Sequence, residues 1–215
     1  MELPVRPPLK PMLGRLARAL PTGEFDYEPK WDGFRCLAFR AGEELDLRSR
    51  HDRPLARYFP ELVEALTALS ADRFVVDGEV VVMGEDGFDF PALMARLHPA
   101  ASRVERLRRE IPAALIAFDL LAVEDEDLRE RPFAERRARL TRLLAAAEPP
   151  LHLTPVTDDP SVAAGWLERF QGAGIDGVMA KRRDQPYEPG VRAMVKVKQR
   201  ADDRLRACRL PGVRR

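Results

Sequence analysis

Alternating and continuous apolar segments predict most of the strands of this chain. Arg35–Arg40 and Glu44–Ser49 alternate between apolar and polar side chains around a turn at 41–43, a pattern typical of a hairpin. Phe74–Met83 and Ala113–Leu121 are nearly continuous apolar runs, which indicates buried strands. Shorter strands are expected at Phe25–Tyr27, Leu151–Val156, Gly174–Lys181 and Met194–Lys198.

Apolar residues at helical spacing predict helices between these strands. Within Tyr58–Leu69 they recur three or four positions apart, and Pro132–Ala147 is amphipathic and opens with a proline, which the first helical turn tolerates. Five prolines before Phe25 exclude one long helix there. Further helices are expected at Leu13–Leu20, Phe90–His98, Ser102–Arg109 and Pro160–Gln171.

Composition narrows the class of protein. The 215 residues are 45% hydrophobic and 33% charged with a net charge of +1, which is ordinary for one soluble domain, or for one large and one vestigial domain. The two cysteines and three histidines are scattered, which argues against a zinc site and a Ser-His-Asp triad. No apolar run is long enough for a membrane span, and no signal-peptide pattern opens the chain. We expect a cytoplasmic monomer with no membrane association.

Lysine is rare in this chain, with five among 36 basic residues. One of the five, Lys30, lies in Glu28-Pro29-Lys30-Trp31-Asp32-Gly33-Phe34-Arg35. Lysine can lose its proton and attack an electrophile, which arginine cannot do, and Gly33 allows a ligand to approach the backbone closely. The segment therefore predicts a lysine nucleophile that faces a phosphate; the alternative is a surface lysine paired with Asp32.

Three further patterns place charged or aromatic residues in strands. Asp77 and Glu79 share a face within an aliphatic strand, where burial is costly unless they point outward or meet a partner. Phe118 interrupts another aliphatic strand and is either core or a stacking residue. Lys196 and Lys198 share a strand face, and their mutual repulsion favours binding to phosphates.

The segment Lys30–Arg35 resembles the K-x-D-G-x-R motif of covalent nucleotidyltransferases, which comprise ATP-dependent DNA ligases, RNA ligases and mRNA capping enzymes. The other patterns follow in the order of that family. The matching positions are Arg50 as a ribose-contacting arginine, Asp77-Gly78-Glu79 as motif III, Phe118-Asp119 as motif IIIa, Asp176–Lys181 as motif IV and Lys196–Lys198 as motif V. From about residue 5 to residue 198 the chain is similar to the short bacterial ATP-dependent DNA ligases associated with end joining.

The resemblance implies an α+β nucleotidyltransferase fold, with two mainly antiparallel sheets flanked by helices and an ATP cleft between them. It implies that Lys30 attacks the α-phosphate of ATP and holds AMP for transfer to a 5′-phosphate at nicked or broken double-stranded DNA, with end-joining repair proteins as candidate partners. The implied nucleotide-binding residues are Glu28 at the adenine edge, Phe118 on the adenine ring, Arg35 and Arg50 at ribose and phosphate, Glu79 near the ribose or a metal, and Lys181, Lys196 and Lys198 at the triphosphate. Asp32 also belongs to the implied nucleotide-binding set. Asp176 and Glu79 are the implied ligands of Mg²⁺ or Mn²⁺.

Two departures from the family pattern alter these expectations. Most relatives carry glutamate where Asp176 stands, so the metal geometry can shift. The expected organisation is a proline-rich leader packing on the domain (1–24), an adenylation domain (25–200) and a basic tail (201–215) with the usual OB-fold absent. A frameshift or a natural tail would explain the ending equally well. For this chain alone, slow self-adenylation, salt-sensitive DNA binding and no multiple-turnover sealing of nicks are expected.

Two other functions remain open at this point. One is another enzyme of the superfamily, an RNA ligase or a capping guanylyltransferase, and labelling from GTP would reveal the latter. The second is a non-catalytic nucleotide-binding remnant, against which the presence of Lys30, Glu79 and the paired lysines argues.

Overall fold

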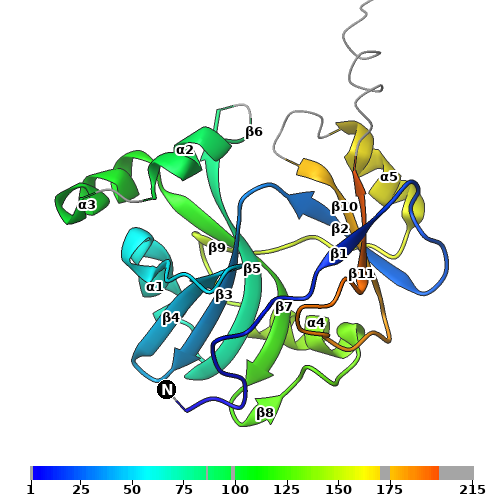
Figure 1. The fold of residues 1–215 in the computed structure, drawn as a ribbon, viewed down its shortest axis with the longest axis horizontal. Coiled ribbons are helices and arrows are strands. Elements are labelled where there is room, and N and C mark those ends of the chain that lie inside the picture. The colour runs from blue at the N-terminus through cyan, green and yellow to red at the C-terminus, as the bar shows by residue number, and fades with distance from the viewer. Residues whose placement is uncertain (1, 86, 98–99, 170–174, 199–215) are drawn as a thin grey trace, which may run out of the picture.

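The computed structural model describes residues 2–85, 87–97, 100–169 and 175–198, which form two sheets set side by side with helices on their outer faces (Figure 1). The larger sheet has the order β4-β3-β5-β7-β8, and all of these neighbours are antiparallel. Its strands are β3 (Phe34–Ala41), β4 (Glu44–Ser49), β5 (Arg73–Gly84), β7 (Ala113–Val123) and β8 (Glu126–Asp127), with β6 (Gly87–Phe88) on β5 and β9 (Leu151–Leu153) parallel to β7.

The smaller sheet has the order β1-β11-β10-β2 and joins the two ends of the described chain. Its strands are β1 (Gly14–Ala17), β2 (Phe25–Trp31), β10 (Ile175–Arg182) and β11 (Met194–Lys198), and only the pair β1 and β11 is parallel. β2 ends this strand order, which explains why it tolerates Pro29. The predicted α+β class with mainly antiparallel sheets is confirmed.

Three apolar clusters hold these layers together. The first lies on one face of the larger sheet and includes residues of α1 (Pro60–Thr67), α2 (Phe90–Ala95) and α4 (Phe133–Leu143). The second joins β3, β5 and β7 to Met194 of β11 and to the N-terminal segment. The third packs α5 (Pro160–Arg169) on the smaller sheet. The remaining helices are η1 (Ala56–Tyr58) and α3 (Ala101–Glu110).

Most predicted elements are present, with one wrong type and several shifted ends. The predicted helix at Leu13–Leu20 is wrong, because the chain there forms β1 and pairs with β11. The predicted strand Phe25–Tyr27 continues to Trp31, which places Lys30 inside β2. The strand predicted at Leu151–Val156 ends at Leu153. His98, Gln171 and Gly174, at the ends of other predicted elements, lie outside the described residues.

The N-terminal segment before β1 packs closely against the rest of the chain. Leu3, Val5 and Met12 are buried in the second cluster beside Leu37 and Tyr187. The division into a leader, an adenylation domain and a tail nevertheless remains a prediction, since the tail at 201–215 lies outside the described residues.

Candidate active site

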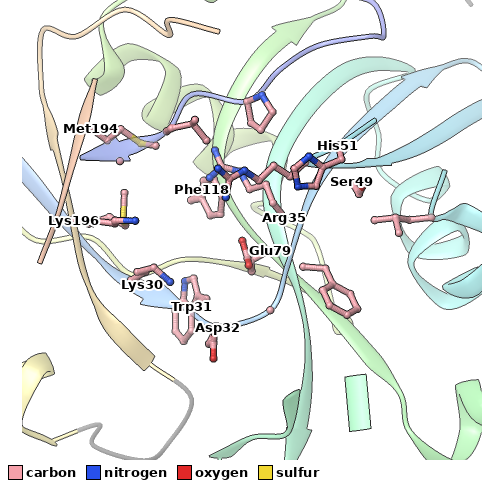
Figure 2. A pocket seen from close by; sticks show the side chains of 18 of the residues that line it. Lys30, Trp31, Asp32, Arg35, Ser49, His51, Glu79, Phe118, Met194 and Lys196 are labelled. Atoms are coloured by element: carbon pink, nitrogen blue, oxygen red, sulfur yellow. The ribbon is translucent and has the colours of Figure 1, made fainter. Parts of the chain in front are cut away.

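A cavity of about 700 Å³ lies between the two sheets and takes side chains from both. Figure 2 shows Lys30 and Lys196 on one side of it, Arg35, Glu79 and Phe118 towards the middle, and Ser49 and His51 opposite. Of the predicted site residues, Asp32 is exposed at its rim and Arg50 is exposed beside His51. The structure therefore brings motifs from distant parts of the sequence to one cavity.

Lys30 is held by an acidic side chain from the neighbouring strand. Its Nζ lies 2.9 Å from Oδ2 of Asp176, and Nζ of Lys198 lies 2.6 Å from the same oxygen. These hydrogen bonds keep the pKa of Asp176 below its usual value despite its partial burial. Asp176 thus fixes two lysines at one point beside the cavity. Lys30 lines the cavity, whereas the predicted site residues Asp176 and Lys198 do not.

A bulge in β10 directs Asp176 towards these lysines. Ile175 pairs with Trp31 and Gly177 pairs with Lys30, so Asp176 is an additional residue in β10. Gly177 has a φ of 155°, and a Cβ on it would lie 2.1 Å from the carbonyl oxygen of Val197. Glycine is therefore required at this position, next to the acid.

Glu79 enters the cavity from β5, where Gly33 passes it closely. A Cβ on Gly33 would lie 2.2 Å from the carbonyl oxygen of Val80, so only glycine allows the turn from β2 into β3 to approach β5. Burial raises the pKa of Glu79 to about 7, although the charges of Arg35 and Lys30 oppose the rise. Glu79 is therefore an unusually basic carboxylate beside the candidate nucleophile.

Replacing Glu79 with glutamine is expected to stabilise the ligand-free protein in alkaline solution. The pKa of Glu79 is about 7 in the folded state against 4.5 for an ordinary glutamate. The folded state binds the proton of Glu79 more tightly than the unfolded state does. This contribution to the free energy of unfolding is fully present below pH 4.5 and is lost as the pH rises through about 7. In urea unfolding, the stability of Glu79→Gln should therefore exceed that of the wild type by about 3 kcal/mol at pH 8 and by less than about 1 kcal/mol at pH 5.

The matched control for this prediction is Glu85→Gln. Glu85 is exposed and directly follows β5, so this change removes a carboxylate charge that is not buried. It should show no comparable dependence on pH. Equal stabilities of Glu79→Gln and the wild type at pH 8 would contradict the prediction.

Arg35 and Phe118 form one wall of the cavity. The guanidinium of Arg35 binds Asp77 with two hydrogen bonds of 2.5 and 2.6 Å, and its carbon lies 4.5 Å from the centre of the Phe118 ring. Asp77 is fully buried, so the outward orientation considered for the acids of β5 is wrong for this residue. Phe118 is 9% exposed and lines the cavity, whereas its neighbours Ala117 and Leu120 belong to the core.

Glu28 and Lys181 form a buried ion pair at another part of the cavity. Nζ of Lys181 lies 2.8 Å from Glu28 and donates to the carbonyl of Phe118, and Arg137 of α4 lies 3.4 Å from Glu28. In the smaller sheet, Lys181 lies opposite Asp26 of β2. It is four positions along β10 from Gly177, which lies opposite both Lys30 of β2 and Lys198 of β11. Its predicted contact with the triphosphate remains a prediction, and its amine already has two partners.

A group of cations gives the cavity a positive field. Burial and the charges of Lys198, Lys30, Arg192 and Arg50 lower the pKa of Lys196. Within the described part of the chain, no ion pair is recorded for Lys196, Arg192 or Arg50. Such a cluster favours a polyanionic ligand.

Sequence reasoning missed several residues that shape the site. Trp31 lines the cavity. Its indole N–H donates to the hydroxyl of Thr154 at 2.8 Å, and its ring packs edge-to-face against Phe88. The sequence gave no indication that Arg137 contacts Glu28, because a single arginine in a basic amphipathic helix is usually a surface residue. The sequence also gave no indication of Tyr187, whose hydroxyl binds the buried Asp77.

The described side chains offer a limited set of metal ligands. They contain no group of three or more acidic, histidine or cysteine side chains that could hold a metal ion. Glu79 lines the cavity and lies within the electrostatic reach of Lys30, whereas Asp176 contacts Lys30 without lining the cavity itself. Mg²⁺ commonly binds one or two carboxylates together with substrate phosphates, so this donor set fits Mg²⁺ only when a phosphate ligand is present.

Comparison with known proteins identifies the family. The model of the ATP dependent DNA ligase domain matches residues 11–198. The chain belongs to this family. It is 54% identical to DNA ligase C2 of Mycolicibacterium smegmatis and 48% identical to DNA ligase C of Mycobacterium tuberculosis, in each case over 92% of this chain and 56% of the relative. The chain thus spans a little over half the length of these ligases.

Solved ligase structures agree with this assignment. A mycobacterial DNA ligase D complexed with ATP and MES is 29% identical and superposes with a TM-score of 0.67, over 88% of this chain and 60% of that one. The ligase domain of M. tuberculosis LigD is 30% identical with the same TM-score, over 88% of this chain and 59% of that one. The expected nucleotidyltransferase fold of the DNA ligases is therefore confirmed. None of the helices in the described ranges has the length and apolar character needed to cross a membrane.

Proposed function

We propose that this chain acts as the adenylation domain of an ATP-dependent DNA ligase, forming a lysyl-AMP intermediate for transfer to a 5′-phosphate at a DNA break. The observation that carries this proposal is the placement of Lys30. It is the lysine of the K-x-D-G-x-R motif, and it lies in a cationic cavity, held by an acid that also holds Lys198. An RNA ligase or a capping enzyme gains no support from the relatives, which are named DNA ligases.

In the proposed reaction, the free amine of Lys30 attacks the α-phosphorus of ATP. A nitrogen–phosphorus bond forms, the bond from phosphorus to the bridging oxygen breaks and pyrophosphate leaves. The nitrogen then loses a proton to water. Asp176 aims the amine, while Lys196 and Lys198 stabilise the charge of the phosphates. Arg35 and Arg50 are assigned to ribose and phosphate, and Asp32 to the rim of the site.

Asp176 and Glu79 are the residues that would hold Mg²⁺ or Mn²⁺, completed by phosphate oxygens of the nucleotide. A bound divalent ion would supply charge neutralisation on the transferred phosphate. The protein itself contributes the orientation of the amine and of the two carboxylates. In this proposal Asp176 must exchange part of its contact with the lysines for the ion.

The adenine base is assigned to the part of the cavity formed by Glu28 and Phe118. Lys181 and Arg137 hold Glu28 in a fixed position, and the carbonyl of Phe118 binds Lys181, so the acid and the ring are linked through one lysine. We therefore assign Lys181 to positioning Glu28 for the base, as an alternative to a direct contact with the triphosphate.

Replacing Phe118 with leucine tests the stacking role. The change roughly keeps volume and apolarity, so the loss of stability should stay below about 1.5 kcal/mol. ATP binding should weaken by about 1 kcal/mol, the size of one aromatic contact. Titration calorimetry with ATP and thermal unfolding measure the two effects. A large fall in melting temperature with unchanged ATP affinity would indicate that Phe118 is only a core residue.

Nicked or broken duplex DNA is the proposed second substrate. Arg50, His51 and Arg53 are exposed on a turn at the mouth of the cavity, and backbone hydrogen bonds between Ser49, Asp52 and Arg53 close that turn. Contacts from arginines such as Arg50 and Arg53 to phosphates weaken steeply with added salt. We further propose a cytoplasmic, monomeric protein that serves DNA repair or recombination together with end-joining proteins.

The proposal is tested by mixing the chain with ATP and Mg²⁺ and measuring its intact mass. A gain of one AMP, absent without the metal and absent with GTP, is the expected result. A gain of GMP from GTP would favour a capping-type enzyme. Binding of ATP with no adduct at any time would favour a non-catalytic nucleotide-binding protein.

A further inference from the structure

A closed ring of hydrogen bonds lies behind the cavity wall that carries Arg35. The hydroxyl of Tyr187 donates to Oδ2 of Asp77 at 2.6 Å and accepts from the backbone N–H of Met12 at 3.0 Å. Arg35 donates from Nε and Nη2 to Asp77, and Nη2 also lies 3.3 Å from the carbonyl of Met12. Four residues from four separate parts of the chain therefore hold one another.

The ring is buried, and it leaves one part of Arg35 available. Asp77 and Tyr187 are 0% and 2% exposed and do not line the cavity, whereas Arg35 does. Burial and the neighbouring carboxylate raise the pKa of the Tyr187 hydroxyl well above its usual value, so it remains a donor. Within the described part of the chain, no hydrogen bond is recorded for Nη1 of Arg35. The guanidinium is thus fixed through two nitrogens and can offer the third to a ligand.

We propose that Tyr187 is a positioning residue for Arg35: through Asp77 it holds the guanidinium over the Phe118 ring, ready for the nucleotide. This role rests on the proposed function, because it assigns Arg35 to nucleotide binding. A free arginine side chain loses rotamer freedom when it binds, and a fixed one has lost that freedom beforehand. Tyr187 therefore strengthens ATP binding without touching ATP.

The test removes only the hydroxyl, in Tyr187→Phe, and follows ATP binding and single-turnover adduct formation by the full chain. Because an arginine held in place aids ground state and transition state alike, the dissociation constant for ATP should rise about five-fold. The maximal rate of adduct formation should stay within about two-fold of the wild type. An unchanged dissociation constant in Tyr187→Phe would overturn the proposal.

Tyr27→Phe is the matched control. Tyr27 is 1% exposed, and its hydroxyl donates to the carbonyl of Pro21 at 2.6 Å in the third cluster, away from Arg35. Both variants lose one buried hydroxyl and should lose comparable stability. Tyr27→Phe should bind ATP as the wild type does. An equal loss of affinity in both variants would indicate general loosening of the fold and overturn the positioning role.

A double-mutant cycle separates this role from a direct effect on the ligand. In an Arg35→Lys background the paired contact to Asp77 is already lost, so adding Tyr187→Phe should change the ATP affinity no further. A full second five-fold loss would show that Tyr187 acts by another route and would contradict the proposal.

A ligand-free measurement distinguishes this inference from the proposed function. The Nε–H signal of Arg35 in ¹⁵N NMR should be sharp and slowly exchanging in the wild type, and should broaden or exchange faster in Tyr187→Phe. A wild type that binds no ATP would refute the proposed function and the nucleotide part of this role together. An Nε–H signal unchanged by the mutation would refute the positioning itself, whatever the protein binds.

Discussion

Replacing Lys30 with arginine is expected to abolish the AMP adduct while leaving the fold intact. Arginine keeps the positive charge that faces Asp176, so the ion pair across the small sheet remains available. It cannot supply a neutral amine, because its guanidinium stays protonated at any accessible pH. Intact-mass measurement after incubation with ATP and Mg²⁺ reports the adduct, and thermal unfolding reports the fold.

Lys10→Arg provides the matched control for this experiment, because it makes the same exchange at a lysine that does not line the cavity. It should form the adduct at the rate of the wild type. Covalent labelling of the Lys30→Arg protein by ATP would show that another residue is the nucleophile.

The largest effect on stability is expected at Asp119, the residue that follows Phe118. Asp119 and Arg136 are 1% and 0% exposed and form two hydrogen bonds of 2.8 and 3.0 Å. Asp119→Asn leaves the arginine charged and buried without its counter-charge, which costs about 3–5 kcal/mol. For a chain of this size the melting temperature should fall by about 10 °C.

The surface pair of Asp127 and Arg129 gives the matched comparison. Both side chains are about one-third exposed, so Asp127→Asn should cost less than about 1 kcal/mol although the geometry of the pair is similar. Replacing both buried partners, as in Asp119→Leu with Arg136→Met, should recover much of the loss. Similar losses of stability in Asp119→Asn and Asp127→Asn would show that burial does not determine how much each ion pair contributes to stability.

Local patterns predicted the type of most elements but, apart from one hairpin, not which strands pair with one another. The β3–β4 hairpin and the buried strands β5 and β7 follow directly from alternation and from continuous apolar runs. The segment Leu13–Leu20, which contains β1, was predicted as a short helix between prolines, with Arg15 and Arg18 facing out. Its hydrogen-bond partner is β11, at the other end of the described chain, and no local pattern carries that information.

The same limit applies to the site. The motifs predicted Lys30, Glu79 and Lys196 as site residues, and all three line one cavity. The motifs gave no indication that Asp176 binds two lysines, since that depends on a bulge in β10. Tyr187 and Arg137 act through buried partners far away in sequence, and such contacts exist only once the layers have packed.

The order of strands in the smaller sheet has a consequence for synthesis on the ribosome. The strands of the larger sheet all lie between residues 34 and 153, so that sheet can form while the chain is still growing. β1 and β2 emerge first, yet their partners β10 and β11 are complete only at residue 198. Until then β2 exposes its backbone, and Pro29 together with the charged Glu28 disfavours its pairing with other chains. The cavity that contains Lys30 is therefore completed last, after the part of the protein that supports it.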